Sequence, residues 1–116
     1  MALPAEKRLK LTRDFRAVSR SKRSVKEGAL LLKAKASQKN SSRFGIVVPK
    51  SVAKKAVHRN RMRRLLSEAL GAQQDSLRGP YDIVLVALPG FSLKDLNEAQ
   101  SIIEKLFLKA KLTRIS

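Results

Sequence analysis

Four arginines and an asparagine crowd into one short stretch of this chain, between residues 59 and 64. The guanidinium group of arginine is planar, and its fork of donors matches the oxygen atoms of phosphate groups. Asparagine adds a neutral donor and acceptor that can bond to a ribose or a base edge. The stretch therefore predicts an RNA or DNA contact made by Arg59, Asn60, Arg61, Arg63 and Arg64.

A helix would present these side chains on one side. At 3.6 residues per turn, one face of such a helix is apolar and the opposite face is polar and basic. A solvated basic face is the plain alternative to a binding surface, but like charges three and four residues apart repel by roughly 0.2 to 0.5 kcal/mol per pair, which favours an anionic partner. The lone His58 is assigned no chemistry. The apolar face consists of Met62, Leu65, Leu66, Ala69 and Leu70, and the polar face of Asn60, Arg63, Arg64 and Ser67.

The charge of the chain is large and unevenly placed. The formal net charge is +17, and residues 1–64 carry all of it, because residues 65–116 hold six basic and six acidic side chains. Such a balance is typical of proteins that bind polyanions. The asymmetry favours a directed binding surface over general solubilisation.

The remaining composition indicates one intracellular domain. A hydrophobic fraction of 43% allows a modest core, and 116 residues are too few for two stable domains. We expect a single domain over residues 1–116, with residues 1–11 as a flexible basic arm. The chain has no cysteine, which excludes a disulfide and a zinc finger. Its longest aliphatic run, Ile83–Leu88, is too short to cross a bilayer, so we expect a cytoplasmic protein without a membrane partner.

The periodicity predicts helices and strands in alternation. Thr12 begins a short helix that ends near Ser19, and strands follow near residues 22–25, 29–36 and 43–48. The segment SQKNSS reads as a hairpin turn between the second and third strands, and Gly71 as the stop of the basic helix. The almost wholly apolar strand at 81–88 is expected to be central. Ser92 and Asp95 form a capping box that begins the last helix. This order predicts an α+β fold with helices packed on a small sheet.

The acidic residues do not suggest a catalytic centre on this chain. A metal-independent nuclease needs paired acid and base groups, and this chain has a single histidine. A two-metal nuclease needs clustered carboxylates, whereas Glu6, Asp14 and Glu27 are widely spaced in the basic part. We therefore expect no catalytic residue and no tightly bound metal.

The run from Arg43 to Glu68 resembles the core of the bacterial ribonuclease P (RNase P) protein family. The strand FGIVVPK, the helix start AVHRNRMRR and the following LLSE match the family pattern, in which the RNR tripeptide is the signature. The opening RLKLTRDF and the strand YDIVLVALP extend the resemblance over nearly the whole chain. The family protein is the small basic subunit that accompanies a catalytic RNA in tRNA 5′ maturation.

The resemblance implies a fold and a division of labour. The fold is a small α-β sandwich of three helices and about four strands, in the order α-β-β-β-α-β-α, with a left-handed βαβ crossover. The partners are the catalytic RNA and the single-stranded 5′ leader of precursor tRNA, and Mg²⁺ is expected on the partner RNA. The implied contacts with the catalytic RNA are Lys50, Lys54, Arg59, Asn60, Arg61, Arg63 and Arg64. The implied contacts with the leader are Phe15, Arg8, Arg13, Leu31 and Lys33.

Alternatives remain open at this point. Phe15 fits a base contact or a core position equally well, since aromatic residues are few in this chain. A structural RNA-binding protein of the ribosomal type would share the size, charge and layout. A third reading is a stand-alone basic ribonuclease.

Overall fold

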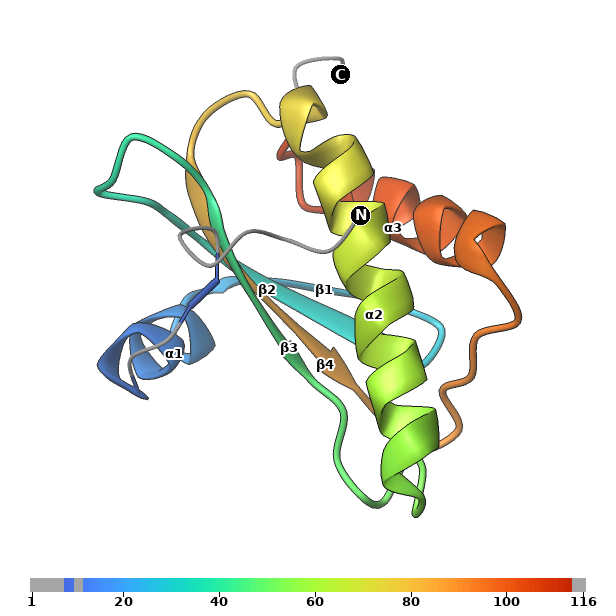
Figure 1. Ribbon diagram of the computed structural model, residues 1–116. Coiled ribbons are helices and arrows are strands. Elements are labelled where there is room, and N and C mark those ends of the chain that lie inside the picture. The colour runs from blue at the N-terminus through green and yellow to red at the C-terminus, as the bar shows by residue number, and fades with distance from the viewer. Residues whose placement is uncertain (1–7, 10–11, 114–116) are drawn as a thin grey trace.

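The computed structural model describes residues 8–9 and 12–113, and the elements below lie within these ranges. The part of residues 1–11 that we expect to be a flexible arm lies outside them, apart from Arg8 and Leu9. Three α-helices, four strands and one short 3₁₀ helix make up the fold (Figure 1). In chain order they are α1 (Thr12–Ser19), β1 (Arg23–Glu27), β2 (Leu30–Ala36), β3 (Arg43–Val47), α2 (Ala56–Gln73), η2 (Gln74–Ser76), β4 (Tyr81–Ala87) and α3 (Leu96–Lys109).

The four strands form one mixed sheet in the order β1-β2-β4-β3. The hairpin predicted between the second and third strands is wrong, because β4 lies between β2 and β3 and pairs with both. The physical reason lies in β4, where every residue except Val86 is buried. A strand this apolar is most stable between two neighbours and beneath both layers of helices. Its central position, predicted from the sequence, is confirmed.

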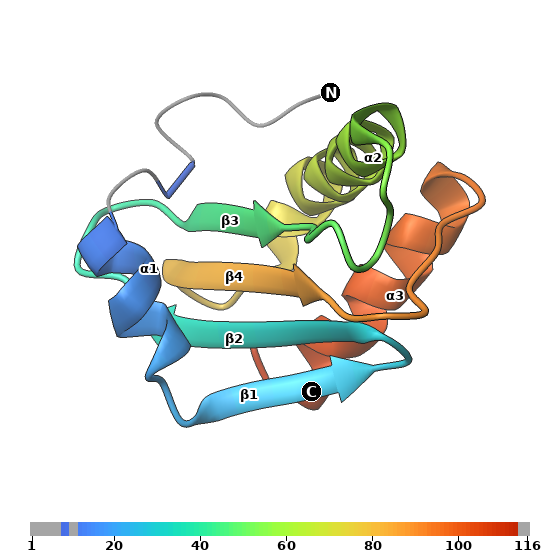
Figure 2. The same ribbon diagram turned by 90° about the horizontal axis from the view of Figure 1, so that it is seen from below.

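The predicted βαβ unit is confirmed. Strands β3 and β4 are parallel neighbours, and α2 connects them. In Figure 2 both strands point to the right and the layer of α2 and α3 lies behind the sheet, so the step from β3 down to β4 is a left-handed crossover. This hand runs against the general preference of such connections.

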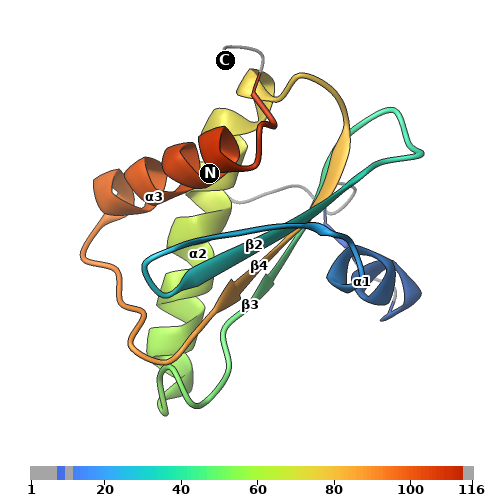
Figure 3. The ribbon, with the colours of Figure 1, turned by 180° about the vertical axis from the view of Figure 1, so that it is seen from behind.

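The helices lie on both faces of the sheet. Helices α2 and α3 cover one face and pack on each other, while α1 lies alone on the other (Figures 1 and 3). The main core fills the space between the sheet and the α2/α3 layer, with Leu66, Leu70, Ile103 and Phe107 fully buried. Beneath α1 a smaller cluster consists of Leu9, Val18 and Val84, with Phe15 and Val86 packed against it. Among the described residues, this second face therefore carries the short helix α1 and Leu9.

Two local predictions about helix ends are wrong. The basic helix does not stop at Gly71 but continues to Gln73, because Ala69 and Leu70 are buried before this glycine and Gln73 after it donates to Gln100 O of α3. The last helix does not begin at Ser92. Its N-cap is Asp95, whose side chain accepts a hydrogen bond of 3.0 Å from the main-chain N–H of Glu98. Among the described helices, none is long and apolar enough to cross a membrane.

Candidate nucleic-acid interface

Helix α2 separates apolar from basic side chains as the sequence predicts. Leu65, Leu66, Ala69 and Leu70 are buried, whereas Asn60 and Arg64 are exposed. The apolar side anchors the helix on β3 and α3. The helix therefore turns its polar face, including the half-buried Arg63 and Ser67, away from the core.

Two arginines of the cluster bind the protein's own main chain. Arg59 donates from Nη1 to the carbonyl oxygens of Ala53 (2.9 Å) and Lys54 (2.7 Å), in the segment before α2. Arg61 donates from Nη1 to Leu93 O (2.9 Å) and from Nη2 to Lys94 O (2.6 Å), in the segment before α3. These hydrogen bonds shape the loops around the start of α2. Arg59 and Arg61 have donors left over, but their side chains are already fixed.

The other arginines face outward with fewer internal contacts. Arg63 donates from Nη2 to Oδ1 of Asn60, one turn earlier on the same face. Arg64 makes no hydrogen bond or ion pair with any residue that the structure describes, and it is exposed. Arg63, Arg64 and Asn60 are therefore placed to meet phosphate and ribose groups.

The N-terminal end of α2 adds positive potential to this surface. The helix begins after Lys55, which provides no side-chain cap, and its first turn contains no acidic residue. The first N–H groups of a helix lack partners within it and carry the positive end of its dipole. Lys50 and Lys54 are exposed in the preceding segment. The lysine side chains and the helix dipole therefore both make the electrostatic potential positive at this end of α2.

The second candidate surface lies on the face of the sheet that carries α1. The ring of Phe15 rests directly on Gly45 of β3, and a Cβ atom added at Gly45 would lie 2.5 Å from Phe15 Cζ and 2.6 Å from Cε1. No side chain larger than hydrogen fits there without moving the ring. Gly45 therefore allows the ring to approach the sheet closely.

A groove of about 350 Å³ runs across the outer edge of β3 and joins the two surfaces. On the α1 side its wall includes Phe15 and Gly45, and on the α2 side Arg63, Arg64 and Ser67. Its floor at the strand edge is Ile46. Arg8 also lines it, because residues 8 and 9 run along this edge and Leu9 N donates to Phe44 O at 2.9 Å. Side chains of both surfaces therefore line one hollow.

The remaining leader candidates are not all brought together. Leu31 and Lys33 of β2 pair in register with Val86 and Val84 of β4, so all four side chains lie on the same face of the sheet. Lys33 donates from Nζ to Ser19 O at 2.9 Å, so it holds the end of α1. Arg13 instead lines a separate hollow of about 250 Å³ beside the β2–β3 connection, together with Lys35 and Lys39. The structure groups Phe15 with Arg8, and Leu31 with Lys33, but places Arg13 apart.

Comparison with known proteins identifies the family. The family model described as Ribonuclease P matches residues 3–111. The chain belongs to the ribonuclease P protein family. It is 38% identical over 118 residues to the ribonuclease P protein component of Synechococcus elongatus, covering 97% of this chain and 96% of that protein. It is 36% identical over 110 residues to the component from Azotobacter vinelandii, covering 94% and 84%.

Solved RNase P protein structures share the fold. The Staphylococcus aureus RNase P protein superposes with a TM-score of 0.82 at 22% identity, covering 93% of this chain and 98% of that one. The RNase P protein from Thermotoga maritima, solved in complex with 1-(4-fluorophenyl)-2-thiourea, gives 0.77 at 25% identity and covers 94% and 100%. The resemblance drawn from the RNR motif and the α+β fold are confirmed.

Sequence reasoning missed two residues beside α1 at the candidate surface. Gly45 was read only as part of an apolar strand, although a glycine inside a strand pattern often marks a close approach of another element. Arg43 was read only as the start of the strand. It donates to Asp82 through Nε (3.1 Å) and Nη2 (2.8 Å) and to Asp14 through Nη1 (3.2 Å). The hydrogen bond from Arg43 to Asp82 is the main cause that raises the pKa of Arg43, against the opposing effect of burial.

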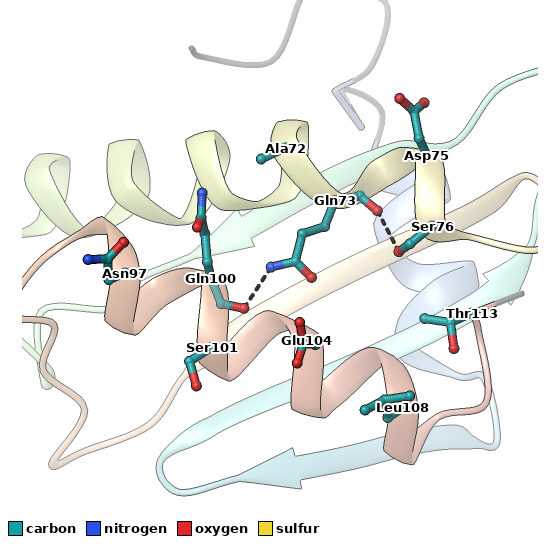
Figure 4. Close-up of a pocket in the computed structure, with 10 residues that line it drawn as sticks. All are labelled: Ala72, Gln73, Asp75, Ser76, Asn97, Gln100, Ser101, Glu104, Leu108 and Thr113. Atoms are coloured by element: carbon teal, nitrogen blue, oxygen red, sulfur yellow. Dashed lines mark hydrogen bonds between the residues drawn. The ribbon is translucent and has the colours of Figure 1, made fainter. Parts of the chain in front are cut away.

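A further hollow lies away from the basic surfaces. It has a volume of about 870 Å³ and opens between the end of α2 and α3 (Figure 4). Gln73 crosses it to donate to Gln100 O at 2.6 Å. Its described lining includes Asp75 and Glu104 but no basic side chain, so it is unsuited to RNA. Within the described residues there is also no group of three histidine, aspartate or glutamate side chains that could hold a metal ion.

Proposed function

We propose that this chain is the protein subunit of an RNase P ribonucleoprotein and assists a catalytic RNA in removing the 5′ leader from precursor tRNA. The observation that carries this proposal is the groove across the edge of β3, which joins the arginines of α2 to the ring of Phe15. An RNA-binding helix alone would suit many proteins. A helix connected to an aromatic ring on an open sheet suits a protein that also holds a single strand.

The exposed side chains of α2 are proposed to contact the catalytic RNA. Arg63 and Arg64 would neutralise phosphates, and Asn60 would accept or donate at a ribose or base edge. Lys50 and Lys54 would extend this contact at the positive end of the helix. Arg59 and Arg61 would contribute charge while their side chains hold the neighbouring loops.

The leader is proposed to lie on the sheet face beside α1. A base stacked on Phe15 would gain about 1 to 3 kcal/mol. Leu31 would offer an apolar contact beside it. Arg8 and Lys33 would neutralise the leader backbone, with Arg13 acting only as part of the more distant electrostatic field.

The cleavage chemistry is proposed to belong to the partner RNA. Mg²⁺ bound to that RNA would activate the attacking water and stabilise the leaving oxygen. This protein would raise substrate affinity and reduce the repulsion between the two RNA molecules, with no catalytic residue of its own. The compartment we propose is the bacterial cytoplasm, where tRNA precursors are made.

A structural RNA-binding role is the second candidate, because charge and the basic helix alone would support it. A leader-length series separates the two. Binding of precursor tRNA by the RNA–protein complex is measured as the leader is shortened from the 5′ end to none. Leader binding predicts that affinity falls as leader nucleotides are removed, and the fall disappears without the protein. Affinity that ignores leader length would support the structural role.

A further inference from the structure

We propose that Arg43 is a positioning residue for the leader site, where its ion pairs fix α1 over the sheet and thereby place the ring of Phe15 on Gly45. This inference rests on the proposed leader site. It assigns a role in leader binding to a charge cluster at the end of the sheet, outside the RNR motif. The cluster consists of Arg43, Asp14 and Asp82.

The cluster connects three elements through one guanidinium group. Arg43 of β3 makes two hydrogen bonds with Asp82, its register partner in β4, and one with Asp14 of α1. The side chains are largely shielded, with relative exposures of 18% for Arg43, 21% for Asp14 and 10% for Asp82. The bidentate pair with Asp82 holds the guanidinium rigid on the sheet. Its remaining nitrogen can then hold α1 in a fixed position.

Adjacent residues of α1 meet alternate residues of β3. Asp14 binds Arg43, and the next residue, Phe15, rests on Gly45. Since side chains of a strand alternate between faces, Arg43 and Gly45 lie on the same face, about 7 Å apart along the strand. The ion pair and the ring contact are thus two neighbouring attachments of one helix turn. A shift of α1 at the first attachment moves the ring at the second.

Helix α1 is short, and the described side-chain hydrogen bond at its C-terminal end is the one from Lys33 Nζ to Ser19 O. It contains eight residues, a length at which an isolated helix is unstable in water. Its described apolar anchor is the small cluster of Leu9, Val18 and Val84. Apolar contacts are not directional, so they allow the helix to slide. The ion pair with Arg43 fixes the N-terminal turn of α1, opposite to the end that Lys33 holds.

The pairing also suits an RNA-binding face. An unpaired carboxylate at Asp14 would repel a phosphate backbone near Phe15. The guanidinium of Arg43 compensates it, and Asp82 is compensated by the same group. The cluster therefore positions α1 without placing an uncompensated negative charge beside the proposed leader path.

Three single variants test the proposal in the reconstituted RNA–protein complex. Asp14→Asn keeps the size of the side chain but removes the ion pair, and Gly45→Ala removes the seat of the ring while leaving the ion pair intact. Asp75→Asn is the matched control, since Asp75 is an exposed carboxylate far from α1 on the opposite layer. The quantity measured is the leader contribution, defined as the affinity for precursor tRNA divided by the affinity for the same tRNA without a leader.

We expect Asp14→Asn and Gly45→Ala each to lower the leader contribution roughly threefold to tenfold. The affinity of these variants for the catalytic RNA should equal that of the wild type. The control Asp75→Asn should leave the leader contribution unchanged. Asp14→Asn and Gly45→Ala are each then combined with Phe15→Ala. Because both act through the ring, they should cost nothing further in that background. If these residues served stability alone, the variants would instead lower the affinity for precursor tRNA and the affinity for the catalytic RNA together. Their effects would also add to the loss caused by Phe15→Ala.

A measurement on the folded protein needs no RNA. Because the Cζ end of the Phe15 ring lies against Gly45, its ring current should displace the Hα resonances of Gly45 in the NMR spectrum from their positions in Phe15→Ala. Asp14→Asn should reduce this shift, and Asp75→Asn should not. An unchanged shift in Asp14→Asn would overturn the positioning role. A wild-type protein without any leader contribution would instead overturn the proposed leader site, so the two failures are distinguishable.

Discussion

The guanidinium group of Arg61 in α2 is bound to the main-chain oxygen of Leu93, 32 residues later and just before α3. A second nitrogen of Arg61 binds Lys94 O in the same segment. The second arginine of the RNR motif therefore connects the two helices that cover one face of the sheet. The motif combines a structural arginine with neighbours that face solvent.

Because Arg61 binds main-chain oxygens whereas Arg64 faces solvent, we expect different effects when each of these two arginines of α2 is replaced. Arg61→Ala should lower the free energy of unfolding by about 1 kcal/mol, because two charged hydrogen bonds to carbonyl groups are lost. Arg64→Ala removes the same charge but no hydrogen bond to the described residues, so stability should be unchanged. Thermal unfolding measures both, with an expected midpoint decrease of roughly 3 to 6 °C for Arg61→Ala alone. Equal midpoints for the two variants would contradict this difference.

Arg64 should instead affect the salt dependence of RNA binding. Each neutralised phosphate contributes about 0.7 to 0.9 to the slope of log affinity against log salt concentration. Arg64→Ala should reduce the slope for the catalytic RNA by about one such contribution. Lys105→Ala is the control, since it removes one exposed positive charge from α3, outside the groove that Arg64 lines. If the control lowers the slope equally, the charge of Arg64 acts only through the general field.

The ring of Phe15 should act only on substrates that carry a leader. Phe15→Ala is expected to weaken binding of precursor tRNA by about 1 to 3 kcal/mol and to leave binding of mature tRNA unchanged. Phe15→Leu keeps apolar packing against the cluster beneath α1 but removes the aromatic face. Equilibrium binding to both RNAs separates the two effects. If Phe15→Leu binds precursor tRNA with the affinity of the wild type, the ring contributes apolar packing and not base stacking.

Tyr81 provides a pH prediction for the fold itself. Burial opposes ionisation of its hydroxyl, but donation from Arg78 at 3.0 Å and the nearby Arg23 outweigh it, so its pKa lies below the usual 10.0. A lowered pKa in the folded state adds stability as pH rises from that pKa towards 10.0, and the contribution is lost below it. Because the chain has a single tyrosine, ultraviolet titration reports this group alone. Arg78→Ala should raise the pKa, and an unchanged titration would contradict the assigned cause.

Much of the fold could be predicted from local patterns. The helix at 56–73 follows from apolar periodicity, because one of its faces is buried, and the strand at 81–87 follows from a continuous apolar run, because both of its faces are buried. The order of strands could not be predicted from the turn alone. The segment between β2 and β3 has the composition of a hairpin, yet β4 takes the place between them. Long-range burial decided that pairing, and local turn chemistry does not record it.

The candidate site was predictable in its residue types but not in its contacts. The sequence predicts polar and basic residues on one exposed helix face, and Asn60 and Arg64 are exposed there in the structure. It does not reveal that Arg59 and Arg61 point to carbonyl groups of distant segments. The contact of Phe15 with Gly45 likewise depends on how α1 docks across the sheet. Such contacts arise from tertiary packing, which a linear pattern of types does not encode.

The most direct test of the account is cleavage of a precursor tRNA by a bacterial RNase P RNA at low Mg²⁺, with and without this protein, with the 5′ end of the product mapped. The account predicts that the protein restores cleavage at the mature 5′ end, and that a combined Arg63→Ala and Arg64→Ala variant restores it poorly. The RNA alone at high Mg²⁺ serves as the control for an active ribozyme. Failure of the protein to restore cleavage with a cognate RNA that passes this control would contradict the proposed function.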